Sequence, residues 1–140
     1  MTTAIRYYSK TGNTKKLADA IGQAAGVLAE TVSLPITEPV DILFLGSSVY
    51  AAGIDSEVKR FITSLDSTKV KKVVNFSTAA LLPSTYKQVK QLLEEKGISV
   101  DEKEFHCRGS FKMLHKGKPD AEDLKEVQAF TEKILNRAKS

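Results

Sequence analysis

The chain has 140 residues, of which 41% are hydrophobic and 27% are charged, a composition typical of a soluble globular protein. This length predicts one domain, residues 1–140, large enough to bury a core without disulfides or metals. Cys107 is the single cysteine, so the sequence excludes an internal disulfide framework and a CxxC motif. No apolar run reaches membrane-spanning length, and Met1-Thr2-Thr3 leads directly into the first predicted strand. We therefore expect no membrane span, no signal peptide and a cytoplasmic location.

The formal net charge is +4, and the basic surplus lies in the second half of the chain. Residues 106–118 contain four basic side chains and no acidic one, namely Arg108, Lys112, Lys116 and Lys118. Such a run usually forms a solvated face. Nucleic acid is a weak alternative, because aromatic residues are few and no recognised binding module is present.

The histidine and cysteine content of the chain gives little support for a metal site or for a nucleophilic catalyst. His106, His115 and Cys107 are too few for a convincing metal centre. His106 and Cys107 are adjacent, so in a strand their side chains would lie on opposite faces and would not form a nucleophile and base pair. We predict Cys107 to be a small buried residue.

The first half of the chain reads as strands alternating with one helix. Residues 3–9 predict a strand, and residues 13–25 carry apolar side chains at spacings of three and four, which predicts an amphipathic helix that stops at Gly26. Residues 28–34 form a short, less apolar run suited to an edge strand. Residues 41–47 predict a strand whose core, Ile42-Leu43-Phe44-Leu45-Gly46, is continuously apolar, as in a central strand covered on both faces.

Residues 48–55 are predicted to form a loop, after which Ser56 can cap a helix. A strand follows over residues 70–77 and a second loop over residues 78–85. Ser84 or Thr85 can start the next helix, which ends at Lys96-Gly97.

The last part of the chain adds one strand and one helix. Residues 98–107 are longer and more polar, as expected at the opposite edge of a sheet, and residues 108–118 form a basic loop. Pro119 and Asp120 open the final helix. Its predicted buried stripe consists of Leu124, Val127, Phe130, Ile134 and Leu135.

This alternation of strands and helices predicts right-handed crossovers and a parallel sheet. Because the two most polar strands are the second and fifth, we predict an α/β three-layer sandwich with a five-stranded parallel sheet in the order 2-1-3-4-5. A ligand in such a sheet lies outside the carboxyl ends of the strands, between strands one and three. Three segments are predicted to meet at the carboxyl ends of these strands, namely residues 9–14, 47–54 and 77–85.

The turn Ser9-Lys10-Thr11-Gly12-Asn13-Thr14 connects the first strand to the first helix. Helix N-termini favour anions, Gly12 permits a close approach of the backbone, and the three hydroxyls can donate hydrogen bonds without adding charge. An ordinary N-cap is the alternative interpretation, although a cap needs one hydroxyl and not three. The position of the turn at the switch point favours a phosphate site.

The chain resembles the flavodoxin-like family over nearly its whole length. Ser9-x-Thr11-Gly12-x-Thr14 fits the family's signature for the phosphate of FMN, and Gly46-Ser47-Ser48-Val49-Tyr50 looks like the second flavin loop. The pattern Phe105-x-Cys107-x-Gly109 is also similar to that of small members. No inserted segment splits the last predicted strand, as in the short form of the family.

The resemblance implies a set of cofactor-binding residues, no catalytic residue and no metal. Residues 9–14 would hold the phosphate, Tyr50 would stack on the flavin, and backbone groups of the second and third loops would line the ring edge. The implied residues are Ser9, Lys10, Thr11, Gly12, Asn13, Thr14, Ser48, Val49, Tyr50, Ala51, Ala52, Gly53, Ser77, Thr78, Ala79 and Ala80.

Three features depart from orthodox flavodoxins. The chain is basic where typical members are strongly acidic. The third loop, residues 77–83, lacks the Gly-x-Gly-Asp sequence. Ala51 follows Tyr50 where many flavodoxins have a glycine that turns over on flavin reduction, so stabilisation of the one-electron reduced flavin is expected to be weaker unless Gly53 takes that role.

By this resemblance the chain is expected to bind FMN and to shuttle electrons between redox partner proteins or to a small-molecule acceptor. The alternative is an FMN-dependent oxidoreductase similar to small quinone reductases or protoporphyrinogen oxidases, because the altered third loop can cover a substrate. A response-regulator-like module is disfavoured, since it needs an acidic cluster where this chain has Ser9, Ser47 and Ser48. We favour the carrier over the enzyme.

Overall fold

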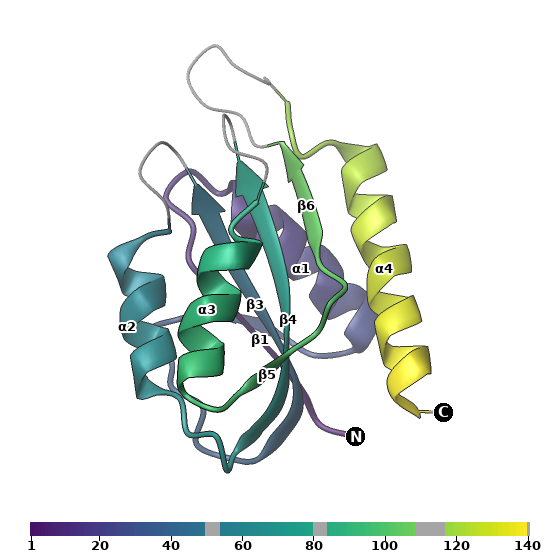
Figure 1. The fold of residues 1–140 in the computed structure, drawn as a ribbon. Helices are drawn as coiled ribbons and strands as arrows, with labels where there is room; N and C mark the ends of the chain where they lie inside the picture. Colours follow the sequence, from purple (N-terminus) through teal and green to yellow (C-terminus); the bar gives the residue numbers. More distant parts are fainter. Residues whose placement is uncertain (50–53, 80–83, 109–116, 140) are drawn as a thin grey trace.

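The computed structural model describes residues 1–49, 54–79, 84–108 and 117–139. Strands and helices alternate along the chain and form three layers (Figure 1). The strands are β1 (Thr3–Tyr7), β2 (Ala29–Thr31), β3 (Val40–Val49), β4 (Val70–Ala79), β5 (Ser99–Val100) and β6 (Phe105–Arg108). The helices are α1 (Asn13–Ala25), α2 (Ser56–Ser64), α3 (Tyr86–Glu95) and α4 (Ala121–Lys139).

The strands form one parallel sheet in the order β2-β1-β3-β4-β5, and β6 also pairs with β4. The register places Lys72 of β4 beside Ser99 of β5, and Phe76 of β4 beside Phe105 of β6. Strands β5 and β6 therefore occupy the same fifth position of the sheet, one after the other. The predicted parallel α/β fold with its 2-1-3-4-5 order is confirmed.

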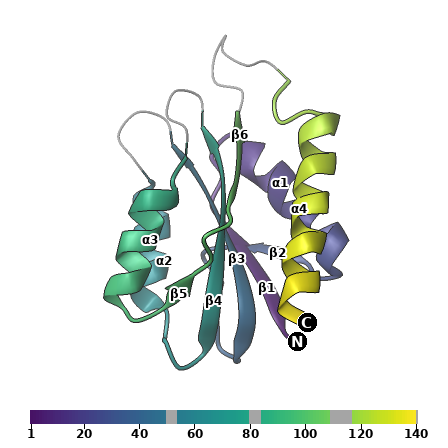
Figure 2. The same cartoon turned by 45° about the vertical axis from the view of Figure 1, so that its right-hand side comes forward.

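Each face of the sheet packs against a pair of helices. Helices α1 and α4 cover one face, and α2 and α3 cover the other (Figures 1 and 2). Leu43 and Leu45 of β3 belong to the α2–α3 core, whereas Ile42 and Phe44 belong to the α1–α4 core. Because both faces of β3 are covered, its side chains are apolar without alternation. Burial of each such side chain stabilises the fold by about 1.5–3 kcal/mol.

Strands β3 and β4 run two residues beyond their predicted ends. Ser48 pairs with Thr78 and Val49 pairs with Ala79, so the parallel ladder continues through segments that we predicted as loops. The hydroxyl residues of both segments keep the strand conformation because each strand supplies the other's backbone partners. As a result, Ser48 and Thr78 have fixed positions at the carboxyl edge of the sheet.

The expected single strand over residues 98–107 is instead divided into β5 and β6. At the division the Asp101 side chain accepts a hydrogen bond from the Lys103 backbone N–H at 2.8 Å, which is a local turn that competes with the ladder. The Asp101 carboxylate also binds Arg137 of α4 and lies 3.8 Å from the Lys72 ammonium. The interruption between β5 and β6 therefore lets the Asp101 side chain reach Arg137 in the last helix.

Helix starts agree with the predictions at α4 and differ at α2. Asp120 accepts from the Asp123 backbone N–H and Asp123 accepts from the Asp120 backbone N–H, both at 3.0 Å, which forms a reciprocal capping box at the predicted start of α4. For α2, the predicted cap Ser56 was wrong. The cap is Asp55, whose carboxylate accepts from the Glu57 backbone N–H at 2.9 Å.

Candidate functional site

The site begins where β1 turns into α1, at the upper edge of the sheet in Figure 1. Gly12 is the residue before the helix and has a left-handed backbone, with φ of 90°. Its N–H donates to Ser9 Oγ at 2.9 Å, and its carbonyl accepts the first helical hydrogen bond, from Lys16 N–H at 3.1 Å. Residues with a side chain rarely adopt this conformation, so the turn needs glycine.

The start of α1 has no side-chain hydrogen bond at its cap position. An ordinary N-cap uses a Ser, Thr, Asp or Asn side chain at the cap position to accept a hydrogen bond from the first helical turn. Here the cap position is held by Gly12, which has no side chain to do so. The start of α1 thus presents backbone N–H groups at the positive end of the helix dipole, which is an arrangement that suits an anion.

Thr14 connects this turn to the two central strands. Its side chain is completely buried, and its Oγ1 lies 3.0 Å from Thr78 Oγ1 of β4 and 3.5 Å from the Ser47 carbonyl oxygen of β3. Ser48 pairs with Thr78 in the ladder and is also buried. The fold therefore brings together hydroxyl residues from the first, third and fourth strand ends, as the sequence predicted.

A second polar network lies on the α2–α3 face of the same edge. Thr85 Oγ1 accepts hydrogen bonds from Ser47 Oγ at 2.9 Å and from Asn75 Nδ2 at 3.1 Å. All three residues are fully buried. Sequence analysis missed Asn75 and the role of Thr85; the available signal was an amide side chain inside an otherwise apolar strand, since buried polar groups need partners.

Ser77 lies beside this network but differs from its members in hydrogen bonding. Its Oγ is buried and has no hydrogen-bond partner among the described residues. An unpaired buried hydroxyl costs about 1–3 kcal/mol, and native proteins seldom keep one unless a water or a ligand satisfies it. Ser77 was among the predicted ligand-binding residues, and its unpaired oxygen fits a ligand at this edge.

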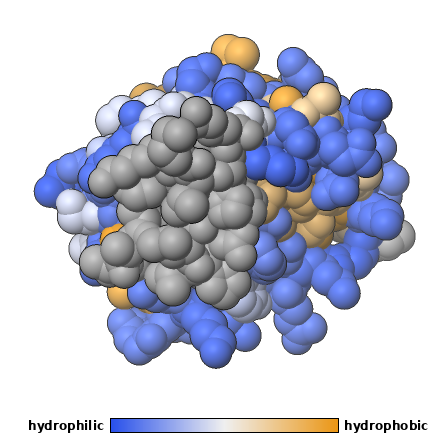
Figure 3. All heavy atoms as spheres, turned by 90° about the horizontal axis from the view of Figure 1, so that it is seen from above, coloured by the Kyte–Doolittle hydropathy of each residue, from blue (hydrophilic) through white to orange (hydrophobic). Residues whose placement is uncertain are grey.

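Two cations next to the turn, Lys10 and Lys15, are paired with carboxylates. Lys10 Nζ lies 3.3 Å from Asp55 Oδ2, which joins the turn to the cap of α2. Lys15 Nζ lies 2.8 Å from Asp19 Oδ2, and this hydrogen bond raises the pKa of Lys15. Because each of these charges is balanced, the turn would hold an anion chiefly through neutral donors. Hydrophilic residues border much of the described surface at this edge (Figure 3).

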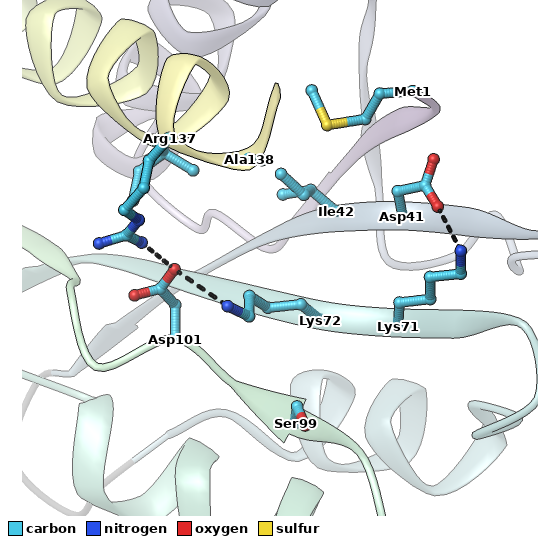
Figure 4. A pocket seen from close by; sticks show the side chains of 10 residues that line it. Met1, Asp41, Ile42, Lys71, Lys72, Ser99, Asp101, Arg137 and Ala138 are labelled. Atoms are coloured by element: carbon cyan, nitrogen blue, oxygen red, sulfur yellow. Dashed lines mark hydrogen bonds and ion pairs between the residues drawn. The ribbon is translucent and has the colours of Figure 1, made fainter. Parts of the chain in front are cut away.

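Two hollows mark the two ends of the sheet. One, of about 320 Å³, lies against the turn and is lined by residues that include Tyr8, Ser9, Gly12 and Lys15. A larger one, of about 710 Å³, lies at the opposite end beside the last turn of α4, where Asp101 holds Lys72 and Arg137 (Figure 4). Only the smaller hollow adjoins residues that the sequence assigned to a site.

Several predicted residues lie outside the part of the chain that the structure describes. These are Tyr50, Ala51, Ala52, Gly53 and Ala80, and of Val49 and Ala79 only the backbone pairing is described. Their predicted roles stay predictions. In the basic stretch over residues 106–118, Lys118 is described, and it lies 2.9 Å from Asp120 and 3.3 Å from Asp123.

Comparison with known proteins identifies the family. A family profile described as a flavodoxin domain matches residues 4–118. The chain belongs to this family. No curated protein sequence matches the chain significantly.

Solved structures of flavodoxins have the same fold as this flavodoxin domain. A flavodoxin from the domain Archaea superposes with a TM-score of 0.80 at 19% identity, covering 100% of both chains. Flavodoxin 2 from Bacillus cereus gives 0.74 at 18% identity, covering 98% of this chain and 99% of that one. The two-electron reduced flavodoxin of Megasphaera elsdenii gives 0.59 at 26% identity, covering 91% and 98%.

The described part of the chain contains neither a candidate membrane span nor a candidate metal centre. Among the described helices, we find no segment with the length and hydropathy that a membrane span requires. Within the same residues, no group of three or more His, Cys, Asp or Glu side chains is arranged to hold a metal ion.

Proposed function

We propose that this flavodoxin domain binds FMN and carries electrons between redox partner proteins or to a small-molecule acceptor. The observation that carries the proposal is the start of α1, where a left-handed Gly12 lies among hydroxyl residues at the switch point of the sheet. Membership of the flavodoxin domain family supports a flavin at that place.

The phosphate would be held by the backbone N–H groups of residues 11, 13 and 14 and by the hydroxyls of Ser9 and Thr11. The Gly12 N–H would keep its bond to Ser9 Oγ, and Lys10 and Asn13 would complete the turn. Thr14 would contribute its hydroxyl to the phosphate or keep it on Thr78, since the two oxygens are 3.0 Å apart. Neutral donors suit a phosphate ester that is bound and not cleaved, because they stabilise its charge without activating a nucleophile.

The flavin ring would lie over the carboxyl ends of β3 and β4. Ser48, Val49, Ser77, Thr78 and Ala79 end these strands and would line the ring edge together with residues 51–53 and 80, while Tyr50 would stack on its face. Ser77 Oγ, buried without a partner, is the described atom best suited to bind the ligand or its water. When bound, the flavin supplies the redox chemistry, and the protein supplies binding, orientation and electrostatics.

A matched pair of glycine variants tests the phosphate site. Gly12 and Gly26 flank the same helix, both have positive φ, of 90° and 75°, and an added Cβ at either would meet nothing within 4 Å. Either alanine substitution therefore introduces backbone strain of about 1–2 kcal/mol without a clash. We expect Gly12→Ala to weaken FMN binding about tenfold or more, and Gly26→Ala to leave it unchanged.

Titration of the cofactor-free protein with FMN, followed by quenching of flavin fluorescence, measures both affinities, and urea unfolding confirms equal loss of stability. Failure of the wild-type protein to bind FMN would contradict the proposed function. Equal weakening by both variants would show that the turn is not the phosphate site.

The alternative function, an FMN-dependent oxidoreductase, differs from a carrier in the acceptor to which it passes electrons. The segment that suggested it, the third loop over residues 77–83, is described only as far as residue 79, so the carrier is the proposal that the described geometry supports. Mixing the reduced protein with a quinone, with oxidised nicotinamide nucleotide and with a ferredoxin-type acceptor separates the two functions. Rapid multiple turnover with a small molecule would contradict a pure carrier.

A further inference from the structure

A cluster of three side chains lies on the α3 face of the sheet, next to the proposed flavin site but outside it. Glu104 is at its centre: its Oε1 accepts a hydrogen bond from Ser84 Oγ at 2.5 Å, and its Oε2 lies 2.6 Å from His106 Nδ1. Ser84 Oγ in turn accepts from the Tyr86 backbone N–H at 3.0 Å. The start of α3 thus fixes the carboxylate, and the carboxylate fixes the imidazole ring.

The order of these groups excludes a nucleophilic triad. In a serine triad the imidazole lies between the hydroxyl and the carboxylate and takes the proton of the hydroxyl. Here the carboxylate lies between the other two, so Ser84 supports Glu104 and is not activated by His106. The Glu104 side chain is 16% exposed and that of His106 is 46% exposed. The group with an accessible edge is therefore the imidazole.

The sheet register places this imidazole close to the flavin site. His106 of β6 pairs with Ser77 of β4, and paired residues of neighbouring parallel strands point to the same face. Adjacent strands are about 4.8 Å apart. His106 therefore lies one strand beyond Ser77, whose buried Oγ has no partner in the described part of the chain, at the edge where residues 77–80 would line the flavin.

We propose that His106, positioned by Glu104, takes up a proton when the bound flavin is reduced. This inference rests on the proposed function. Two electrons from the reduced partner, or from dithionite, convert the oxidised flavin to a reduced form that has bound one proton and carries one negative charge. At a pH between the two titration midpoints of His106, a fraction of the molecules also takes up a solvent proton on His106. Two electrons and more than one proton are then taken up per molecule on average, and the imidazolium offsets part of the new charge.

Few other described charges act on this histidine. The carboxylate bonded to the imidazole is that of Glu104. The start of α3 contributes the uncharged Ser84 and the phenol of Tyr86. The centre of the Tyr86 ring lies 5.7 Å from Lys90 Nζ. From β4 comes the uncharged Ser77. Glu104 contacts the imidazole in both redox states, so the change on reduction has to come from the flavin.

Proton NMR of the FMN-loaded protein tests the coupling directly, because the titration of His106 can be followed in the oxidised and in the dithionite-reduced states. We expect reduction to raise the proton affinity of His106 about tenfold, which moves its titration midpoint by about one pH unit. By linkage, protonation of His106 must favour reduction by the same factor.

The midpoint potential, measured from pH 5 to 9, gives the reciprocal readout. The flavin's own proton makes the potential depend on pH in every variant; we expect the additional pH dependence near the His106 titration to disappear in His106→Gln and to persist in His115→Gln, the variant of the other histidine. Glu104→Gln keeps a hydrogen-bonding side chain without the charge, so it should move the His106 titration to lower pH in both redox states.

Three results separate success from failure. Failure of the wild-type protein to bind FMN would overturn the proposed function and this inference together. If FMN binds but the His106 titration is the same in both redox states, only the inference is overturned. The same conclusion follows if His106→Gln and the wild type show identical pH dependence of the potential.

Discussion

The buried contact between Thr14 and Thr78 predicts how much two single valine variants and the double variant lose in the free energy of unfolding. The side-chain oxygens of the two threonines are 3.0 Å apart, and the side chains are 0% and 1% exposed. Thr14→Val keeps the shape but leaves the Thr78 hydroxyl without this partner, which costs about 1–3 kcal/mol, whereas the added methyl group gains about 0.8 kcal/mol. We therefore expect a net loss of about 0.2–2 kcal/mol in the free energy of unfolding.

Thr78→Val should cost less, because Thr14 Oγ1 retains the Ser47 carbonyl as a weak acceptor at 3.5 Å. The double variant removes both hydroxyls and leaves neither unpaired, so its loss should be smaller than the sum of the single losses by about 1 kcal/mol or more. Urea unfolding of the cofactor-free protein measures all three. With a typical slope of about 2 kcal/mol per molar urea, Thr14→Val should lower the midpoint by about 0.1–1 M.

Additive losses in the double variant would refute this reasoning, because two side chains that do not interact have independent effects. An unchanged midpoint for Thr14→Val would refute it as well. Measuring FMN affinity on the same variants separates the structural role of Thr14 from its proposed contact with the phosphate.

Three further predictions concern other parts of the chain. Hydrogen bonds from Asp123 N–H and Lys118 hold the pKa of Asp120 at about 2, below the ordinary 3.8; the destabilisation caused by Asp120→Ala should thus be constant above about pH 5 and vanish as the pH falls from about 4 to 2. Urea midpoints at several pH values check this. Burial raises the pKa of Cys107 to about 12, so a disulfide reagent at pH 8 should label the native thiol roughly a hundredfold or more slowly than the unfolded one. Asp101→Asn, which keeps the acceptor for Lys103 N–H, should cost about 0.2–1 kcal/mol, and Asp101→Ala about 1 kcal/mol more, as measured by thermal unfolding.

Much of the fold follows from local sequence patterns. The bounds of α1 agree with the prediction from apolar spacing, because one helix face must be apolar to pack on a sheet. The continuous apolar run over residues 42–46 identified the central strand, since only a strand buried on both faces carries such a run. Gly12 was identified as the turn residue because its neighbours on either side read as a strand and a helix.

The carboxyl edge of the sheet was also predictable, since parallel strands linked by helices must end on the same side. The sequence therefore determined which segments meet, namely those after β1, β3 and β4. It did not determine the lengths of β3 and β4. Residues 48–49 extend β3 only because they pair with residues 78–79 of β4, and the reverse is equally true, so neither extension can be recognised from its own local sequence.

The side-chain partners at this edge were decided only by the tertiary structure. Thr14 meets Thr78 across 64 positions of sequence, and His106 meets a carboxylate that is held by the start of another helix. Local periodicity identifies the face on which a side chain lies but not the register between elements, and a shift of one residue would exchange the faces. For this reason the sequence predicted a hydroxyl-rich phosphate turn, whereas the Glu104-bound imidazole beside it could be recognised only once the strands were packed.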